Sequence, residues 1–551
     1  MMMNMRKHIL AALAALILLP FIASAQNGRF RIGKWVEIHN AILTELNRSY
    51  VDTLPLSRME SAAAHAMLEA LDPYTVYIPE EEREDMDMVL NKVYGGIGAI
   101  IAKPDVDGNV IINEPYENSP AALAGLRCGD EILSIDGVST HGLTSAESSE
   151  RMRGEPGTTV VFRVKRIHKG PSWKAGDIME IKIVRKRIHL PDVEYAGMLE
   201  DGTTGYLLLS GFTEGAAEAV KSSFLRLRDQ GMKKFVLDLR GNGGGRLNEA
   251  VDIVSLFVPR GSIVVTSKGR VAGSEYEYKT SKQPCDLTMP LVVLVDGGSA
   301  SASEIVSGAL QDYDRATIIG TRTYGKGLVQ SIRPLPYDGQ LKVTTAKYYT
   351  PSGRCVQAID YAKRGEDGSV SPIPDSLTHA FTTAHGRTVR DGGGITPDHI
   401  VKPKRYSRLA YALVLGGIVD QYALKYAQEH ASIPPLKDFH FTDYDDFVAF
   451  AKEKEFDYRS GAMAIFDQLK AELKEDGLEE VASEQLAALG AVLEMDKERF
   501  LRLQKDEILP FIEEEIAVRY YYQRGGVLMN MRYDTQLQQA LTLPLISTLL
   551  P

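Results

Sequence analysis

The sequence predicts a multidomain α+β protein with a helical N-terminal segment, a small strand-rich unit, a larger α/β unit and a helical C-terminal domain. Three observations support this class. At 551 residues the chain is too long for one typical domain. Short apolar β-branched runs, such as residues 291–295, alternate with helical patterns through the middle of the chain. Beyond residue 403 the apolar residues recur at helical spacing.

Residues 1–25 have the pattern of a secretory signal peptide. Arg6 and Lys7 precede an apolar run at residues 9–22, and Ala23-Ser24-Ala25 is a small-x-small cleavage signal. An uncleaved membrane anchor is the alternative. No other run is long and apolar enough to span a bilayer. We therefore expect an exported, periplasmic protein that is soluble or peripherally attached after signal-peptide cleavage.

The composition is that of a globular protein, with 44% hydrophobic and 25% charged residues. The formal net charge of −10 argues against a nucleic-acid partner. No His/Cys cluster has the spacing of metal ligands, so no metal is expected. Three cysteines, Cys128, Cys285 and Cys355, leave at least one thiol unpaired in an exported chain, and we interpret them as structural or incidental.

Residues 26–93 are predicted to be helical, because their apolar residues fall on two helical stripes. The unit that follows, residues 94–190, opens with a glycine-rich loop that leads into a strand. Residues 119–138 then add a short helix with a proline near its start, a strand and a tight turn. This pattern resembles a PDZ domain.

By that resemblance the unit would bind a peptide carboxyl terminus as an added strand. The backbone N–H groups of Gly96, Ile97 and Gly98 would hold the peptide carboxylate. Taken alone, such a glycine run could equally be a turn or a bulge. Arg153 could assist by its charge, although a solvated arginine is the simpler interpretation.

Residues 191–402 are predicted to form an α/β core of repeated strand–helix elements. A buried strand at residues 235–239 leads into the run Arg240-Gly241-Asn242-Gly243-Gly244-Gly245. A glycine run can cradle a phosphate, but this one lacks the lysine and hydroxyl of a P-loop and the spacing of a dinucleotide fingerprint. Half of an oxyanion hole, beside a serine nucleophile on the neighbouring strand, is a better interpretation.

Three serines, Ser299, Ser301 and Ser303, stand where an apolar strand turns into a helix, and Lys326 lies between two glycines after the next apolar strand. Separately, such serines are usually helix caps and such a lysine is usually solvated. Because neighbouring strands bring both loops to one edge of a sheet, however, a serine and a neutral lysine could form a hydrolase there. Periodicity alone does not choose among the three serines.

These motifs together resemble those of the carboxyl-terminal processing peptidases, also called tail-specific proteases, which are exported serine peptidases with an embedded PDZ domain. The resemblance implies a crotonase-like core in which Ser301 is the nucleophile and Lys326, 25 residues later, is the neutral general base. It also implies that Gln330 orients the lysine amine. The oxyanion hole would consist of the backbone N–H groups of Gly245 and Ala302.

We therefore expect an exported serine endopeptidase that recognises substrate carboxyl termini through its PDZ domain and cleaves through an acyl-enzyme, without a cofactor. The alternatives are a catalytically silent binding or scaffold protein of the same fold, and a crotonase-type acyl-CoA enzyme. The intact set of Ser301, Lys326 and Gln330 favours the peptidase. Export to a compartment without CoA argues against the last alternative.

The C-terminal region, residues 403–551, is expected to be a helical scaffold or oligomerisation domain without site chemistry. Its predicted helices lie at residues 406–428, 443–454, 459–475, 483–489 and 496–522. Because helices flank the core at both ends of the chain, we expect a homo-oligomer, in particular a dimer, formed through the terminal helices.

Overall fold

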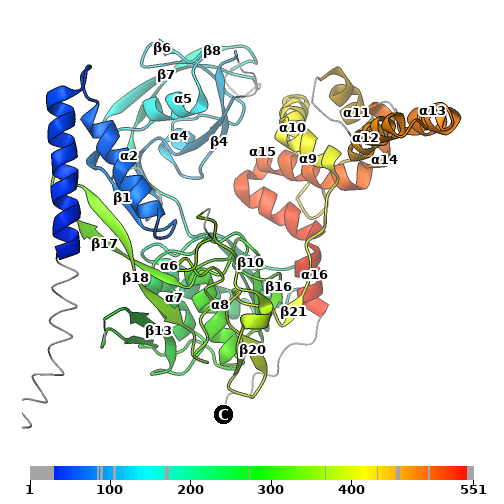
Figure 1. Ribbon diagram of the computed structural model, residues 1–551. Helices are drawn as coiled ribbons and strands as arrows, with labels where there is room; N and C mark the ends of the chain where they lie inside the picture. The colour runs from blue at the N-terminus through cyan, green and yellow to red at the C-terminus, as the bar shows by residue number, and fades with distance from the viewer. Residues whose placement is uncertain are drawn as a thin grey trace, which may run out of the picture. The chain divides into compact units, whose positions relative to one another are not determined.

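The computed structural model describes residues 30–83, 86, 88, 91–103, 107–167, 173–271, 273–365, 368–430, 432–454, 460–493 and 497–542 (Figure 1). The chain divides into two compact units, Met1–Tyr77 and Ile78–Pro551. The predicted signal peptide at residues 1–25 lies outside the described residues. Within the described ranges, no helix combines the length and the hydrophobicity needed to cross a membrane.

The first unit is helical, in agreement with the sequence. Residues 30–49 form one helix, and α2 follows at Leu56–Glu69. Asp72 stabilises the turn after α2, because its carboxylate accepts hydrogen bonds from the backbone N–H groups of Tyr74 and Thr75, both at 2.9 Å.

The strand-rich unit predicted at residues 94–190 is an antiparallel sheet with two short helices. The strand order is β3-β4-β5-β7-β8, with β6 paired to β5, while β2 pairs separately with β9. Thr144 and Glu147 form a capping box at the start of α5. The elements up to the end of this unit are β1 (Val76–Ile78), η1 (Glu80–Glu82), β2 (Val93–Gly96), β3 (Ala99–Ala102), β4 (Val110–Pro115), α4 (Pro120–Leu123), β5 (Glu131–Ile135), β6 (Val138–Ser139), α5 (Ser145–Met152), β7 (Thr159–Lys165), β8 (Ile178–Val184) and β9 (Lys186–His189).

The α/β core contains a six-stranded sheet with the order β10-β11-β12-β15-β16-β21. Strands β10 and β11 are antiparallel, and the remaining neighbours are parallel. A second sheet pairs β13 with both β14 and β18, and β17 with β18. The elements are β10 (Val193–Met198), β11 (Thr204–Leu209), α6 (Ala216–Asp229), β12 (Lys234–Asp238), α7 (Leu247–Ser255), β13 (Ile263–Gly269), β14 (Tyr276–Lys279), β15 (Leu291–Val295), α8 (Ala302–Asp312), β16 (Thr317–Gly320), β17 (Leu328–Pro334), β18 (Gln340–Tyr349), η2 (Asp375–Leu377), β19 (Ala380–Thr382), β20 (Thr388–Arg390) and β21 (His399–Ile400).

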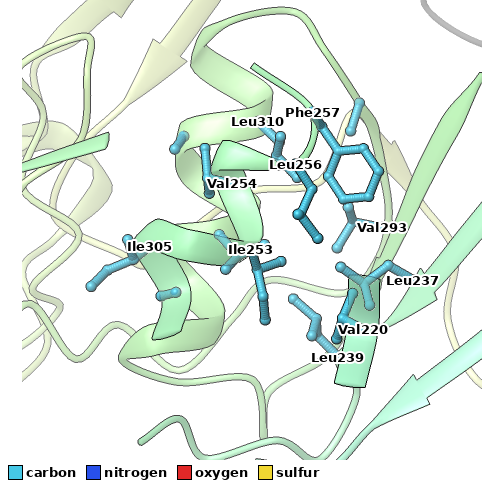
Figure 2. Close-up of a cluster of buried hydrophobic side chains, with 14 of the residues drawn as sticks. Val220, Leu237, Leu239, Ile253, Val254, Leu256, Phe257, Val293, Ile305 and Leu310 are labelled. Atoms are coloured by element: carbon cyan, nitrogen blue, oxygen red, sulfur yellow. The ribbon is translucent and has the colours of Figure 1, made fainter. Parts of the chain in front are cut away.

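The two faces of the six-stranded sheet bury alternate residues of the same strands. On one face, residues such as Leu237 and Val293 pack against α6, α7 and α8 (Figure 2). On the other face, Val236 and Val292 pack in a cluster with Leu537 of the last helix. Coverage on both faces explains why β15 reads as a continuous apolar run, with every residue buried.

The C-terminal domain is helical, as predicted, and buries its own core. The single helix predicted at residues 406–428 is interrupted at Gly416 and Gly417. The helix predicted to end at Tyr522 continues beyond a kink at that residue, where φ is 57° and ψ is −163°. The helices are α9 (Arg408–Leu415), α10 (Ile418–Glu429), α11 (Tyr444–Glu453), α12 (Gly461–Glu475), α13 (Ser483–Leu493), α14 (Lys497–Leu503), α15 (Lys505–Tyr533) and α16 (Thr535–Thr542).

Candidate active site

The loops predicted to carry chemistry meet at one edge of the six-stranded sheet. Strands β12, β15 and β16 are parallel neighbours, so the segments that follow them leave the sheet at the same edge. A cavity of about 690 Å³ lies there. All five predicted residues of the peptidase site, Ser301, Lys326, Gln330, Gly245 and Ala302, line it.

Ser301 occupies a strained turn between β15 and α8. Its φ of 55° and ψ of −112° lie outside the regions that most residues adopt. The other two serines are fully buried and hold the turn. Ser299 Oγ donates to the carbonyl oxygen of Leu239 at 2.7 Å, and Ser303 Oγ donates to that of Asn242 at 2.8 Å. Among the three serines, the structure places only Ser301 on the cavity.

The glycine run after β12 packs directly against the serine turn. A Cβ on Gly244 would lie 2.8 Å from the Ser301 Cβ and 2.9 Å from the Ala302 nitrogen, and its φ is +100°. Only glycine fits this position without a backbone shift. No described residue accepts a hydrogen bond from the backbone N–H of Gly245 or of Ala302. Ala302 is the first residue of α8, where backbone N–H groups lack partners within the helix.

Glu304 connects the serine turn to the lysine loop. Its buried carboxylate accepts hydrogen bonds from the backbone N–H groups of Ser301 at 2.9 Å, Gly325 at 2.7 Å and Lys326 at 2.8 Å. The Thr323 hydroxyl donates to the same carboxylate at 2.6 Å. Burial raises the pKa of Glu304, and these hydrogen bonds oppose the increase. The sequence analysis assigns no role to Glu304, although its spacing of three residues from Ser301 is that of a capping box.

Tyr348 is a second residue whose role the sequence did not indicate. Its buried hydroxyl donates to the carbonyl oxygens of Lys326 at 2.7 Å and Ser301 at 3.1 Å. Gln330 follows a register shift in β17, and its Nε2 donates to Thr344 Oγ1 at 3.2 Å. The strand pair β17–β18 therefore supports one side of the cavity.

The predicted peptide-binding residues lie in the strand-rich unit and are not among the residues that line this cavity. Gly96 ends β2, and Ile97 and Gly98 connect it to β3. A second cavity of about 510 Å³ is lined by residues that include Tyr94 and Arg153, but not by these three. The Arg153 guanidinium lies 5.7 Å from the centre of the Tyr94 ring. Burial raises the pKa of Tyr94 to about 12.

The described part of the chain contains neither a candidate metal site nor a disulfide. No group of three or more His, Cys, Asp or Glu residues there is arranged to hold a metal ion. Cys128, Cys285 and Cys355 all lie in the described ranges and form no disulfide there.

A PDZ-like unit joined to an α/β core with a serine and a lysine on one cavity is the arrangement predicted for a serine-type peptidase. Comparison with protein families agrees with this class. Residues 203–362 match the model of peptidase family S41, residues 111–166 match a PDZ domain, and residues 409–543 match the C-terminal helical domain of a probable PDZ-protease. The predicted fold class is thereby confirmed.

Several individual proteins are similar to this chain. It is 37% identical over 339 residues to the carboxy-terminal-processing protease of Bartonella bacilliformis, covering 61% of this chain and 74% of that protein. It is 33% identical over 317 residues to a probable CtpA-like serine protease of Staphylococcus aureus, covering 56% and 60%. A solved photosystem II D1 C-terminal processing protease is 24% identical with a TM-score of 0.35, covering 67% of this chain and 86% of that one. The chain belongs to peptidase family S41, with the carboxy-terminal-processing proteases.

Proposed function

We propose that the protein is an exported endopeptidase that recognises substrate carboxyl termini and cleaves with a Ser301–Lys326 dyad. One observation carries the proposal: Ser301, Lys326 and the backbone of Gly245 and Ala302 line one cavity at the edge of the sheet. The hydrogen bonds that Glu304 accepts from both the serine turn and the lysine loop add support, because they join the two halves of the proposed dyad.

The proposed mechanism begins when Ser301 Oγ attacks the scissile carbonyl while Lys326 Nζ takes the hydroxyl proton. The oxyanion that forms would accept hydrogen bonds from the backbone N–H groups of Gly245 and Ala302. Lys326 then returns the proton to the leaving amine, and the peptide C–N bond breaks. Water attacks the acyl-enzyme, again with the lysine as base, and releases the carboxylic acid and the serine.

This mechanism requires a neutral amine on Lys326, whereas a free lysine titrates near ~10.4. Apolar surroundings and neighbouring cations both lower the pKa of an amine. The cavity lining includes the apolar side chain of Leu328 and the cations Arg246 and Lys342. Burial lowers the pKa of Lys342 itself. The apolar side chain and the two cations favour a neutral amine, whereas the Glu304 carboxylate that accepts from the Lys326 backbone N–H favours the charged form.

Substrate recognition is proposed to occur at the PDZ unit. Strand β3 lies at the edge of its sheet, so its outer backbone groups could pair with an added peptide strand. The segment Gly96–Gly98 precedes β3 and would offer backbone N–H groups to the terminal carboxylate. Helix α5 packs near β3 and would provide one wall of the peptide groove.

Export and self-association complete the proposal. The signal-peptide pattern at residues 1–25 supports a periplasmic location. Large apolar side chains are exposed on the helix at residues 30–49, with Trp35 66% exposed, and they support a dimer formed through the terminal helices. Light scattering over a concentration series tests the dimer, and a monomer at every concentration would contradict it.

The dyad is tested by hydrolysis of a peptide with a free carboxyl terminus and by labelling with a fluorophosphonate. Ser301→Ala should abolish both, and Lys326→Ala should lower kcat by at least about 10³-fold. Ser222→Ala is the matched control, because the Ser222 side chain is exposed on α6 and its loss should leave hydrolysis and labelling intact. Full hydrolysis by Ser301→Ala would refute the dyad, and a wild-type protein that neither cleaves nor labels would favour a catalytically silent scaffold.

A further inference from the structure

We propose that the C-terminal helical domain holds the oxyanion loop, residues 240–245, in its working position through Asp534 and Gln536. Both would be positioning residues, because they act through Arg240 at the start of the loop. The proposal rests on the function proposed above, which assigns the Gly245 N–H to the oxyanion hole. It gives the C-terminal domain a part in catalysis, where the sequence indicated only a scaffold.

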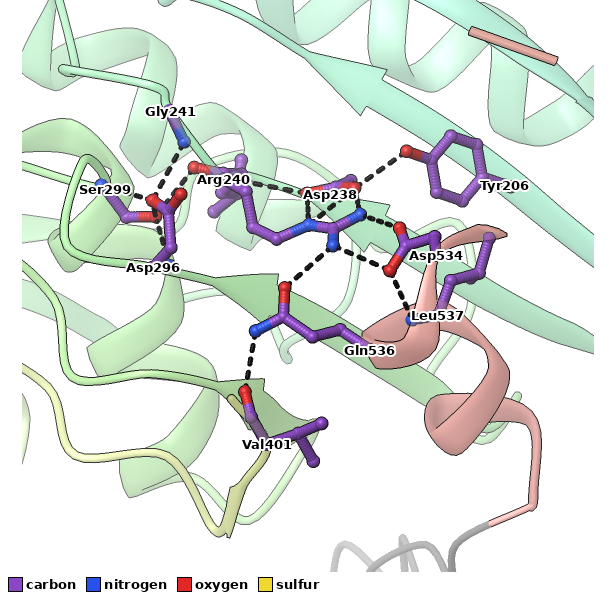
Figure 3. Close-up of polar contacts among 11 residues, drawn as sticks. Tyr206, Asp238, Arg240, Gly241, Asp296, Ser299, Val401, Asp534, Gln536 and Leu537 are labelled. Carbon is purple, nitrogen blue, oxygen red and sulfur yellow. Dashed lines mark hydrogen bonds and ion pairs between the residues drawn. The ribbon is translucent and has the colours of Figure 1, made fainter. Parts of the chain in front are cut away.

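The contact itself is a charged clamp on Arg240 (Figure 3). Arg240 Nη2 lies 2.5 Å from Asp534 Oδ2, and Arg240 Nη1 lies 3.0 Å from Asp534 Oδ1. Gln536 Oε1 accepts a further hydrogen bond from Arg240 Nη1 at 2.9 Å. Only 19% of the Arg240 side chain and 16% of the Asp534 side chain are exposed, so this bidentate pair is largely shielded from water.

The opposite edge of the guanidinium is held by β12. Asp238 accepts from Arg240 Nε at 3.0 Å at each of its oxygens and from Nη2 at 2.5 Å. Asp238 is buried and also accepts from the Tyr206 hydroxyl at 2.7 Å. Because Asp238 already balances the charge of Arg240, Asp534 is not needed for neutrality. Its effect is geometric, since it fixes the edge of Arg240 that β12 does not reach.

Asp534 and Gln536, which contact Arg240, are held in place by hydrogen bonds of their own. Gln536 Nε2 donates to the carbonyl oxygen of Val401 at 2.6 Å, and Leu537 N donates to Asp534 Oδ1 at 2.9 Å at the start of α16. Leu537 itself is buried in the cluster on the second face of the sheet. The packing of α16 therefore fixes the position of Asp534.

Arg240 is followed at once by backbone that contacts the nucleophile turn. The Gly241 N–H donates to Asp296 Oδ1 at 2.9 Å, and the Asn242 carbonyl oxygen accepts from the Ala300 N–H at 3.0 Å. Gly244 then approaches Ser301 and Ala302 without room for a side chain. A shift of Arg240 would therefore move the loop relative to Ser301. Misplacement by about 1 Å in an active site can cost on the order of 10²-fold in rate.

The test compares kcat, KM, the rate of fluorophosphonate labelling and the melting temperature across variants of the full chain. Asp534→Ala should lower kcat by about tenfold or more with KM changed less than about twofold, because only the transition state uses the oxyanion hole. Labelling should slow in parallel. Asp534→Asn, which keeps part of the hydrogen bonding to Arg240, should recover part of the loss.

Two further variants separate positioning from packing. Leu413→Ala removes packing inside the C-terminal helical core without touching Arg240 or α16, so it should lower the melting temperature while kcat per folded molecule stays near wild type. Gln538→Ala alters an exposed side chain and should change neither. If Asp534→Ala lost activity only in proportion to its unfolded fraction, or raised KM instead, the positioning role would be wrong. If Ser301→Ala retained hydrolysis, the proposed function itself would fail.

Discussion

At the scale of single residues, Glu304 holds the two halves of the proposed dyad in register. Four donors converge on its carboxylate, from Ser301, Thr323, Gly325 and Lys326. An ionised carboxylate can accept from all four donors. Because the group is fully buried, water cannot replace any bond that is lost. The nucleophile turn and the lysine loop are thus coupled through one side chain.

Replacing this carboxylate by an amide should disrupt both loops. In Glu304→Gln the side-chain NH₂ faces some of the same donors, and each donor left without an acceptor costs roughly 1–3 kcal/mol. We expect the unfolding free energy to fall by at least about 2 kcal/mol and kcat to fall at least about tenfold. Urea unfolding and peptide hydrolysis measure the two effects. Glu218→Gln, on the exposed face of α6, is the control, and an equal loss there would contradict a specific role for Glu304.

At the scale of elements, the loop after β12 can approach the serine turn closely because it is rich in glycine. Gly244, the middle glycine of the run 243–245, leaves no room for a Cβ beside Ser301. Gly243, one residue earlier, has no heavy atom within 4 Å of the position of a Cβ. A Cβ has no room at Gly244 but has open space at Gly243. Alanine substitutions at these two adjacent positions therefore form a matched pair of variants.

Gly244→Ala should push the loop away from the serine turn. The added Cβ would lie 2.7 Å from the Ala300 oxygen and 2.9 Å from the Ala302 nitrogen, in a left-handed backbone conformation that disfavours alanine. We expect kcat to fall by about 10²-fold or more, the loss typical of one oxyanion donor, together with a lower unfolding free energy. Gly243→Ala should leave the unfolding free energy close to wild type. Equal destabilisation by both variants would show that the close approach at Gly244 does not exist in solution.

At the scale of the whole chain, the proposed function would involve three of the matched segments. The PDZ unit offers an edge strand, the core carries the cavity, and α16 completes the second face of the core sheet. Asp534 and Gln536, which contact Arg240, show that the C-terminal domain packs against the peptidase core. Its last helix belongs to the packing of the peptidase core.

If the PDZ unit selects substrates by their carboxyl termini, the terminal charge should matter. A substrate peptide with an amidated carboxyl terminus should lose at least about tenfold in kcat/KM, because backbone N–H groups bind a carboxylate far better than a neutral amide. Hydrolysis of the free and amidated forms of one peptide measures this. An ester substrate too short to reach the PDZ unit is the control and should be cleaved without such a preference. Equal kcat/KM for the free and amidated peptides would contradict tail recognition.

Much of this arrangement could be predicted locally. Continuous apolar runs identified the buried strands, glycine runs identified the turns at their ends, and the parallel order implied that those turns would meet. The helix pattern beyond residue 403 was correct in class, although Gly416 and Gly417 divide one predicted helix and Tyr522 kinks another. Local patterns succeed here because hydrophobic periodicity and backbone preference act over a few residues.

The sequence by itself determined the class of protein, the order of its parts and a short list of candidate site residues, with Ser301 as the nucleophile that the family resemblance implies. The tertiary structure decided the physical difference among the three serines, because the hydroxyls of Ser299 and Ser303 donate to distant carbonyl groups. The structure likewise revealed the pairing of Arg240 with Asp534, which lies 294 residues further along the chain. No local pattern encodes such a contact, since it forms only when α16 packs onto the sheet.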